Sequence, residues 1–188
     1  MIVRPLKRSD LNDVIRILVL SFERELATIF RDVDLAREIL GEFFEKNPEG
    51  CFVAEDGRVV GFLRITFEEQ KIFGFLREKL GFIDGLRASL LLKFFVKNPK
   101  KGEGFVNFIV VSPFRRGNGI GSALMRRAIE EARIRNLKSL KCMISAGSES
   151  ITFFEKFGFE IEKLIESKLA ERYFSSKEWV ILKKDLSI

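Results

Sequence analysis

Apolar residues recur along this chain in short runs and in periods of three to four residues, which predicts alternating strands and helices. Residues 2–6 form the first predicted strand. We expect Ser9 to cap a helix that has Asp10 in its first turn. The apolar stripe of that helix consists of Leu11, Val14, Ile15, Leu18 and Phe22. A second helix is predicted over residues 35–46, before the helix-ending Asn47-Pro48 step.

The middle of the chain predicts a hairpin followed by an apolar insert. Residues 51–54 and 59–65 are predicted strands, and the Asp56-Gly57 dipeptide between them is a strong hairpin signal. Residues 68–98 then predict two helices, separated by Gly81 and Gly85. Their apolar positions are Ile72, Phe73, Phe75, Leu76 and Leu80 in the first, and Leu86, Leu90, Leu91, Phe94 and Phe95 in the second.

The second half of the chain continues the alternation. Strands are predicted at 106–111, 140–145, 159–165 and 179–182. A helix reaching about residue 136 follows the first of these strands, with Ile120, Leu124, Ala128 and Ala132 facing inward. Another is expected to open at Ser148-Glu149 and to stop at Gly158. The whole pattern indicates an α/β fold.

A glycine-rich turn connects the strand at 106–111 to the helix after it. Its sequence is Arg115-Arg116-Gly117-Asn118-Gly119-Ile120-Gly121. Such a turn directs free N–H groups and the positive end of the helix dipole toward an anion, so it predicts a phosphate-bearing ligand. The spacing matches neither a P-loop, which needs a lysine before Ser122, nor the G-x-G-x-x-G dinucleotide fingerprint.

Composition places the chain among globular proteins. Its 188 residues suit one domain, and 46% are apolar against 32% charged. We find neither an apolar run of membrane-span length nor a signal-peptide core, and therefore expect a cytoplasmic protein without a membrane span. The net charge of +6 favours an anionic ligand. No basic tract is interleaved with aromatic residues, so we expect no nucleic-acid partner.

Two features of composition narrow the chemistry. The chain has no histidine, which excludes Ser-His and Cys-His catalysis. Cys51 and Cys142 have no metal-ligand spacing, so we expect two buried reduced thiols and no metal. Abundant Lys, Arg and Glu beside a single glutamine is a composition typical of thermophiles.

Two motifs carry a family resemblance. The R-x-x-G-x-G pattern from Arg116 to Gly121, with its preceding strand, its Val111-x-Pro113 step and its following helix, resembles the acyl-CoA loop of the GCN5-related N-acetyltransferases (GNAT). The run Ile151-Thr152-Phe153-Phe154-Glu155-Lys156-Phe157-Gly158-Phe159 is similar to a second motif of that family. The resemblance implies a single domain over residues 1–188. Its fold would be a mixed central sheet of about seven strands flanked by helices, with the helical insert of residues 68–98 between strands 3 and 4.

The resemblance also implies a reaction and a set of binding residues. Acetyl-CoA would donate an acetyl group to an amine, on a small molecule or a protein, by direct attack in a ternary complex. Backbone groups of Ile109, Val110 and Val111 would pair with the pantetheine arm, and the amide of Val110 or its neighbour would polarise the thioester. The pyrophosphate would be held by the charge of Arg116 and by the amides of Gly117, Asn118, Gly119, Ile120, Gly121 and Ser122.

The sequence departs from the family pattern at the side chains that usually move protons. The two positions of the family's glutamates are Phe105 and Cys142, and Gly147 replaces its helix-opening asparagine. In that family a tyrosine protonates the leaving thiolate. The corresponding residue here is Phe154, which has no acidic proton, so we expect it only to contact the coenzyme. Other candidates for acid–base or binding roles are Glu103, Asn107, Ser145 and Tyr173.

Alternatives remain open. The chain could be a catalytically silent acyl-CoA-binding module, since a fold does not fix a function. The apolar insert could hold an acyl chain longer than acetyl, or could be a dimerisation arm. For the arm, charged residues at Leu91 and Phe95 would dissociate a homodimer. The identity of the amine acceptor is not encoded in any motif that we recognise.

Overall fold

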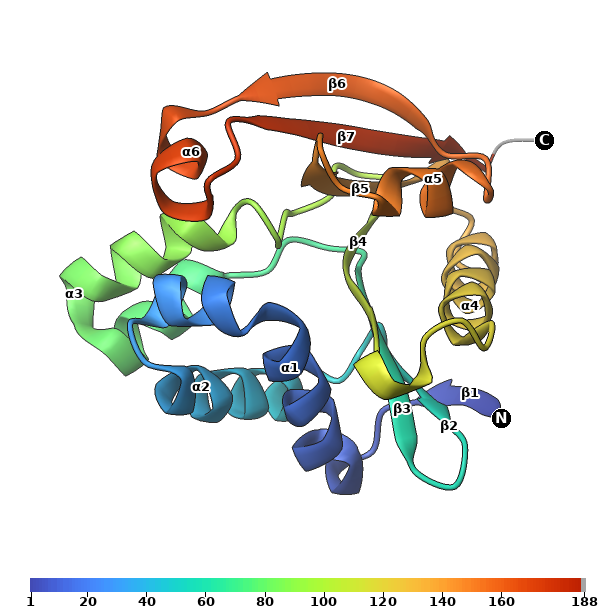
Figure 1. Ribbon diagram of the computed structural model, residues 1–188, viewed down its shortest axis with the longest axis horizontal. Helices are drawn as coiled ribbons and strands as arrows, with labels where there is room; N and C mark the ends of the chain where they lie inside the picture. Colours follow the sequence, from blue (N-terminus) through green and yellow to red (C-terminus); the bar gives the residue numbers. More distant parts are fainter. Residues whose placement is uncertain (187–188) are drawn as a thin grey trace. The chain divides into compact units, whose positions relative to one another are not determined.

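The computed structural model describes residues 1–186 and contains a mixed seven-stranded sheet in the order β1-β2-β3-β4-β5-β7-β6 (Figure 1). The strands are β1 Ile2–Pro5, β2 Cys51–Glu55, β3 Val59–Thr66, β4 Glu103–Val111, β5 Ser139–Ser145, β6 Glu160–Glu166 and β7 Glu178–Asp185. The helices are α1 Leu11–Phe30, α2 Val33–Lys46, α3 Ile72–Leu92, α4 Ile120–Ile134, α5 Ser150–Glu155 and α6 Lys168–Phe174, with 3₁₀ turns at Arg8–Asp10 and Pro113–Arg115.

The chain divides into two compact units. The first comprises Met1–Ile65 and Phe108–Ala128, and the second comprises Thr66–Asn107 and the chain from Ile129 onward. The boundary therefore crosses β4 and α4. The glycine-rich turn between these two elements lies wholly in the first unit.

In the first unit, β1, β2 and β3 form an antiparallel ladder covered by helices on both faces (Figure 1). Side chains alternate between the faces along β3. Phe62 packs on Phe44 of α2 with ring centroids 5.1 Å apart. The neighbouring Gly61 faces the other way, toward Ile120 and Leu124 of α4.

An ion cluster fixes the start of α1. Arg4 donates to both carboxylate oxygens of Asp10, at 2.7 and 2.9 Å, and to Glu55 at 2.6 Å. Asp10 also accepts the backbone N–H of Lys7 at 2.8 Å. The prediction that Ser9 caps the helix is therefore wrong. Ser9 is exposed in a 3₁₀ turn, and the Asp10 carboxylate accepts the N–H of Lys7, the residue before that turn.

The predicted apolar stripe of α1 is interrupted. Phe22 has the non-helical angles φ −136° and ψ 28°, so the helix bends there before continuing to Phe30. The Phe22 ring lies 6.1 Å from the ring of Phe108 on β4. The bend is a consequence of tertiary packing, because the periodicity of the sequence continues through it.

In the second unit, β5, β7 and β6 form an antiparallel ladder, and the start of β4 pairs in parallel with β5. A buried cluster packs beside them, consisting of Phe94, Phe105, Met143, Ala170 and Trp179. Phe95, Ile165, Phe174 and Ile181 pack against this cluster. Cys142 on β5 and Cys51 on β2 are both buried and free, as predicted.

The insert is one interrupted helix. Gly81 has φ 77° and ψ 177°, which divides α3 into two helical segments, close to the two predicted helices. The segments cross closely at Gly85, where a Cβ atom would lie 2.8 Å from Cα of Arg77. Phe94 and Phe95, predicted within the second helix, instead follow its end at Leu92.

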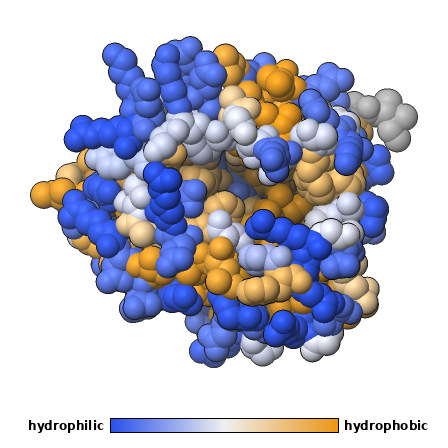
Figure 2. All heavy atoms as spheres, in the orientation of Figure 1, coloured by the Kyte–Doolittle hydropathy of each residue, from blue (hydrophilic) through white to orange (hydrophobic). Residues whose placement is uncertain are grey.

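The apolar surface of the insert differs from the one expected for a dimerisation arm. Leu91 is 1% exposed and Phe95 packs on the core cluster, so charged residues there would disrupt folding and would not report on a dimer. The exposed large apolar residues of α3 are instead Phe82 and Ile83, at 62% and 80%, and Leu86 and Leu90, both at 42%. Hydrophobic spheres project in Figure 2 where Figure 1 draws the bend of α3.

Helix α6, between β6 and β7, was not predicted from the sequence. Ser167 caps it by accepting the N–H of Ala170 at 3.2 Å. Its seven residues are too few for periodicity to reveal it, although a serine before Leu169-Ala170-Glu171 is a usable start signal. Within residues 1–186, no helix combines the length and apolar character that crossing a bilayer requires.

We predict that Asp10→Asn destabilises the protein in a pH-dependent way. The hydrogen bonds from Arg4 hold the pKa of Asp10 below its ordinary value. The stabilisation is therefore present above the unfolded-state pKa of about 4, and is lost as pH falls through the folded-state value. Urea unfolding at pH 7 should show a loss of about 1.5–3 kcal/mol that shrinks toward pH 2.

The matched control is Asp13→Asn. Asp13 pairs with Arg16 one helical turn away, and the two side chains are 40% and 41% exposed. Its loss should stay within about 0.5 kcal/mol at every pH. Equal losses in the two variants would contradict the assigned role of Asp10.

Candidate functional site

The turn between β4 and α4 has a backbone that demands glycine. Gly117 and Gly119 have φ angles of 80° and 73°, in the left-handed region that side chains rarely adopt. No atom lies within 4 Å of a Cβ built at either position, so the turn faces open space there. These two glycines thus leave an accessible stretch of backbone at the start of α4.

The amides of this turn have no internal acceptors. The first helical hydrogen bond runs from Ala123 N–H to the Gly119 carbonyl at 3.0 Å. Among residues 1–186, no acceptor is recorded for the N–H groups from residue 116 to residue 122. The Asn118 side chain donates to the carbonyls of Arg115 and Arg116, at 3.2 and 3.3 Å, so these two carbonyls are occupied by a side chain of the turn itself. The resulting set of donors, at the positive end of a 15-residue helix, suits a phosphate or diphosphate.

The two arginines of the turn have different surroundings. Arg115 forms an ion pair with Asp56 in the β2–β3 turn, and its Nε is buried without an acceptor among the described residues. Arg115 therefore anchors the loop. Arg116 is exposed beside the open amides, which leaves its guanidinium available to an anion.

A close approach to β3 positions the end of β4. Ser112 donates its N–H to the Val60 carbonyl at 2.8 Å. A Cβ atom at Gly61 would lie 3.0 Å from side-chain atoms of Ile120 and Leu124, and 3.2 Å from the Val110 carbonyl oxygen. Sequence analysis missed Gly61, although an isolated glycine within a strand pattern is a signal of close backbone approach.

These contacts fix which backbone groups of β4 face outward. Within a strand, the N–H and C=O of one residue point to the same edge, and successive residues alternate. Since the Val110 carbonyl and the Ser112 N–H face β3, Ile109 and Val111 present their groups at the other edge. The structure therefore favours Ile109 and Val111, the neighbours of Val110, as donors to a ligand at that edge.

The pairing between β4 and β5 covers only the start of β4. It runs from Glu103↔Ser139 to Phe105↔Lys141, and no further pair follows at Val106 or Asn107. The recorded ladder thus ends before residues 106 and 107, the last residues of β4 in the second unit.

Two of the predicted acid–base candidates have structural partners. The Glu103 carboxylate lies 3.0 Å from Nζ of Lys141, which is also 2.9 Å from Glu162. Asn107 donates to Thr66 Oγ1 and accepts the Lys97 N–H at 3.2 Å, so both ends of its amide are occupied. Both side chains thus hold neighbouring segments of the second unit together.

Ser145 and Tyr173 lie at different places in the second unit. The Ser145 hydroxyl, at the end of β5, is 2.6 Å from the hydroxyl of Ser176, which donates to the Glu178 carbonyl at 3.3 Å. Ser176 had no signal in the sequence. The Tyr173 ring lies under the guanidinium of Arg87, 5.5 Å from ring centroid to Cζ.

The four positions that depart from the family pattern offer no acid or base. Phe105 belongs to the core cluster, and burial raises the pKa of the Cys142 thiol. Phe154 is 3% exposed, with its ring 5.3 Å from that of Phe159. Gly147 is exposed and has no side chain. Within residues 1–186, no three His, Cys, Asp or Glu residues are grouped closely enough to hold a metal.

We predict that Gly61→Ala destabilises the protein by about 1–3 kcal/mol in urea unfolding, because the new methyl group overpacks α4 and β4. The matched control is Gly74→Ala in α3, where nothing lies within 4 Å of the added atom. That change should stabilise by up to about 1 kcal/mol through helix propensity. Wild-type stability in Gly61→Ala would show that the close approach is not a constraint.

Comparisons with known proteins agree on one family. The acetyltransferase (GNAT) family matches residues 11–159. The uncharacterized N-acetyltransferase MJ1207 of Methanocaldococcus jannaschii is 22% identical over 170 residues, 89% of this chain, and the chain spans only 64% of that relative's length.

Solved structures share the fold. Ard1 from Thermoplasma volcanium has a TM-score of 0.64 at 19% identity, over 100% of this chain and 98% of that one. Ribosomal-protein-alanine N-acetyltransferase from Brucella melitensis has a TM-score of 0.66 at 23% identity, over 99% and 100%. At these identities the likeness concerns the fold alone.

Proposed function

Because this chain belongs to the acetyltransferase (GNAT) family, we propose that it transfers an acetyl group from acetyl-CoA to an amine. Members of the family generally use acetyl-CoA as the donor. The observation that carries the proposal is the run of unpaired amides from residue 116 to residue 122 at the start of α4. Such a run suits the pyrophosphate of a coenzyme, and the family match supplies the acyl group that the coenzyme would carry.

The proposed binding mode assigns a role to each part of the first unit's site. The loop amides and the Arg116 guanidinium hold the pyrophosphate. The outward edge of Ile109 and Val111 pairs with the amides of the pantetheine arm. One of these two N–H groups polarises the thioester carbonyl, and it remains fixed because Gly61 and Val60 hold β4 from the other side.

The proposed reaction is a direct displacement. The neutral amine attacks the thioester carbonyl carbon, the C–N bond forms, and the C–S bond breaks with release of the coenzyme thiolate. The ammonium proton passes through the Ser145 hydroxyl to solvent, and the thiolate takes a proton from solvent. Losing general acid–base assistance lowers a rate by about 10²–10⁴-fold without abolishing turnover, which is compatible with Phe105, Cys142 and Phe154.

Ser145 is our preferred side chain for moving a proton. It is half-buried, and its hydroxyl already belongs to a short chain through Ser176. Tyr173 is the second choice because the guanidinium of Arg87 covers its ring. Glu103 and Asn107 rank lower because an ion pair and hydrogen bonds already occupy their side chains. We further propose a cytoplasmic location, since two free buried thiols suit a reducing compartment.

We predict that Gly119→Glu abolishes acetyl-CoA binding, because its carboxylate would face the diphosphate. The φ of 73° at this position strains any side chain, so Gly119→Ala is the control for strain alone. Isothermal titration calorimetry should give a Kd for Gly119→Ala within about tenfold of wild type, and no measurable heat for Gly119→Glu. Equal affinity of Gly119→Glu and wild type would remove the loop from the site.

We also predict turnover with at least one amine. Wild-type protein, acetyl-CoA and a panel of polyamines, amino acids, aminoglycosides and peptide N-termini would be incubated together, with free thiol detected. Thiol release should require the amine, and Ser145→Ala should lower kcat by about tenfold or more while leaving the Kd of acetyl-CoA unchanged. Coenzyme binding without acetylation of any amine would identify a silent acyl-CoA-binding module instead.

A further inference from the structure

The insert and the residues beside it form an open pocket that no residue of the glycine-rich turn lines. It has a volume of about 820 Å³, which is within the range of small-molecule sites. Its walls come from the first turn of α3, from the second segment of that helix, and from residues 93–98 that follow it. All of these residues belong to the second unit.

Hydrogen bonds hold the base of this pocket. Gln70 N–H donates to Asn98 Oδ1 at 2.9 Å, and Asn98 Nδ2 donates to the Gln70 carbonyl at 3.4 Å. The Lys97 N–H donates to Asn107, which donates in turn to Thr66. The segments before and after α3 are thus tied to each other, which gives Asn107 a clear structural role.

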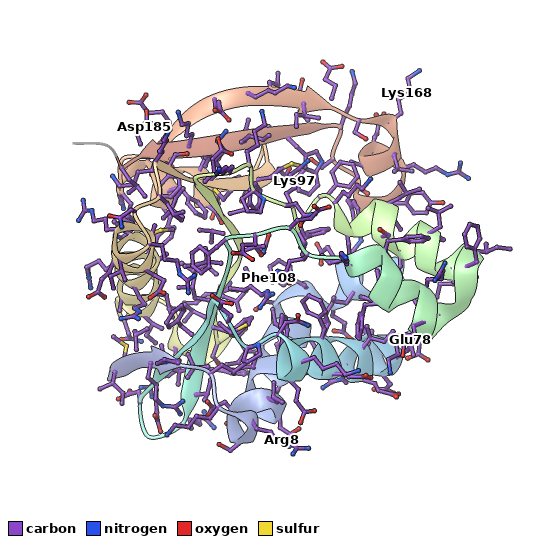
Figure 3. All side chains as sticks on the ribbon, turned by 180° about the vertical axis from the view of Figure 1, so that it is seen from behind. Arg8, Glu78, Lys97, Phe108, Lys168 and Asp185 are labelled. Atoms are coloured by element: carbon purple, nitrogen blue, oxygen red, sulfur yellow. The ribbon has the colours of Figure 1, made fainter. Side chains whose placement is uncertain are left out.

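Three lysines line the pocket. They are Lys71, Lys93 and Lys97, and none has a carboxylate within ion-pair distance among residues 1–186; Glu69 is the acidic residue of the lining. Lys97 lies on the connection between α3 and β4 (Figure 3). Burial lowers the pKa of Lys97, and the charges of Lys93 and Lys163 lower it further. An anion placed here would relieve this unfavourable environment.

The remaining wall of the pocket is apolar. It is formed by Ile72, Phe73, Leu86, Leu90, Leu92 and Val96. A hydrocarbon chain could cover these side chains and gain about 0.8 kcal/mol for each buried CH₂ group. A ligand that satisfies both walls must therefore combine an anionic head with an apolar chain.

We propose that the pocket binds an organic monocarboxylate with an apolar chain of about six to ten carbons. The carboxylate accepts hydrogen bonds from the lysine ammonium groups, and the chain packs on the apolar wall. The methyl end of a longer acyl group is a poorer occupant, because it would desolvate lysines without giving them a partner. The inference is independent of the proposed acetyl transfer, since no residue of the glycine-rich turn takes part.

Calorimetry at pH 7 with the intact protein tests the chemistry of the ligand. Decanoate, decanol and acetate would be titrated separately, each below its aggregation limit. We expect decanoate to bind about tenfold or more tightly than decanol, because charge-assisted hydrogen bonds discriminate by that amount, and acetate to give no heat. Equal affinity for decanol, or no binding of decanoate at millimolar concentration, would overturn the proposal.

Variants locate the binding within the pocket. Lys97→Met removes the charge and keeps the length of the side chain, and should weaken decanoate about tenfold. Lys93→Met is a second variant at an exposed side chain, which keeps the test valid if Lys97→Met fails to fold. Lys101→Met is the control, since Lys101 is exposed and outside the pocket. A decanoate affinity that is unchanged in both pocket variants, or lowered equally in the control, would contradict the site.

Discussion

The site depends on how the end of β4 is held against β3. The Val60 carbonyl accepts the Ser112 N–H, and the missing side chain of Gly61 admits the Val110 carbonyl together with two side chains of α4. Because backbone groups alternate in direction along a strand, those of Ile109 and Val111 point away from β3. The same contacts place the start of α4, and hence the direction of its unpaired amides.

In the function that we propose, the chemistry rests on the main chain. The positions that the family resemblance assigns to acid–base side chains are Phe105, Cys142 and Phe154, all of them buried in the second unit. Burial keeps the Cys142 thiol protonated by raising its pKa. Fixed N–H donors need no ionisable group and do not depend on pH in the neutral range. The proposed reaction therefore relies on positioning and carbonyl polarisation.

The insert adds a feature that the sheet does not need. Gly81 bends α3, Gly85 lets its two segments cross closely, and Asn98 closes the base against Gln70. The resulting pocket brings together lysines, which at a protein surface are normally paired with a carboxylate or solvated by water. The ligand that we propose for this pocket would contact only residues of the second unit, whereas the glycine-rich turn belongs to the first.

The sequence by itself determined the order of the strands and of every helix except α6, the glycine-rich turn and the family, because these depend on short-range periodicity and on spacing within a few residues. Gly117 and Gly119 have the positive φ angles that their pattern indicates, and Ile120, Leu124, Ala128 and Ala132 are buried as their period predicts. Only the tertiary structure decided that Asp10 and not Ser9 accepts the hydrogen bonds before α1, and that α1 bends at Phe22. It also decided that Glu103 and Asn107 connect neighbouring segments through an ion pair and hydrogen bonds. Glu103 contacts Lys141 and Asn107 contacts Thr66, both distant along the chain, and no local pattern encodes such a partner. The partners of Asp10 are the nearby Lys7 and Arg4, but the periodicity of apolar residues does not indicate which polar side chain accepts their hydrogen bonds.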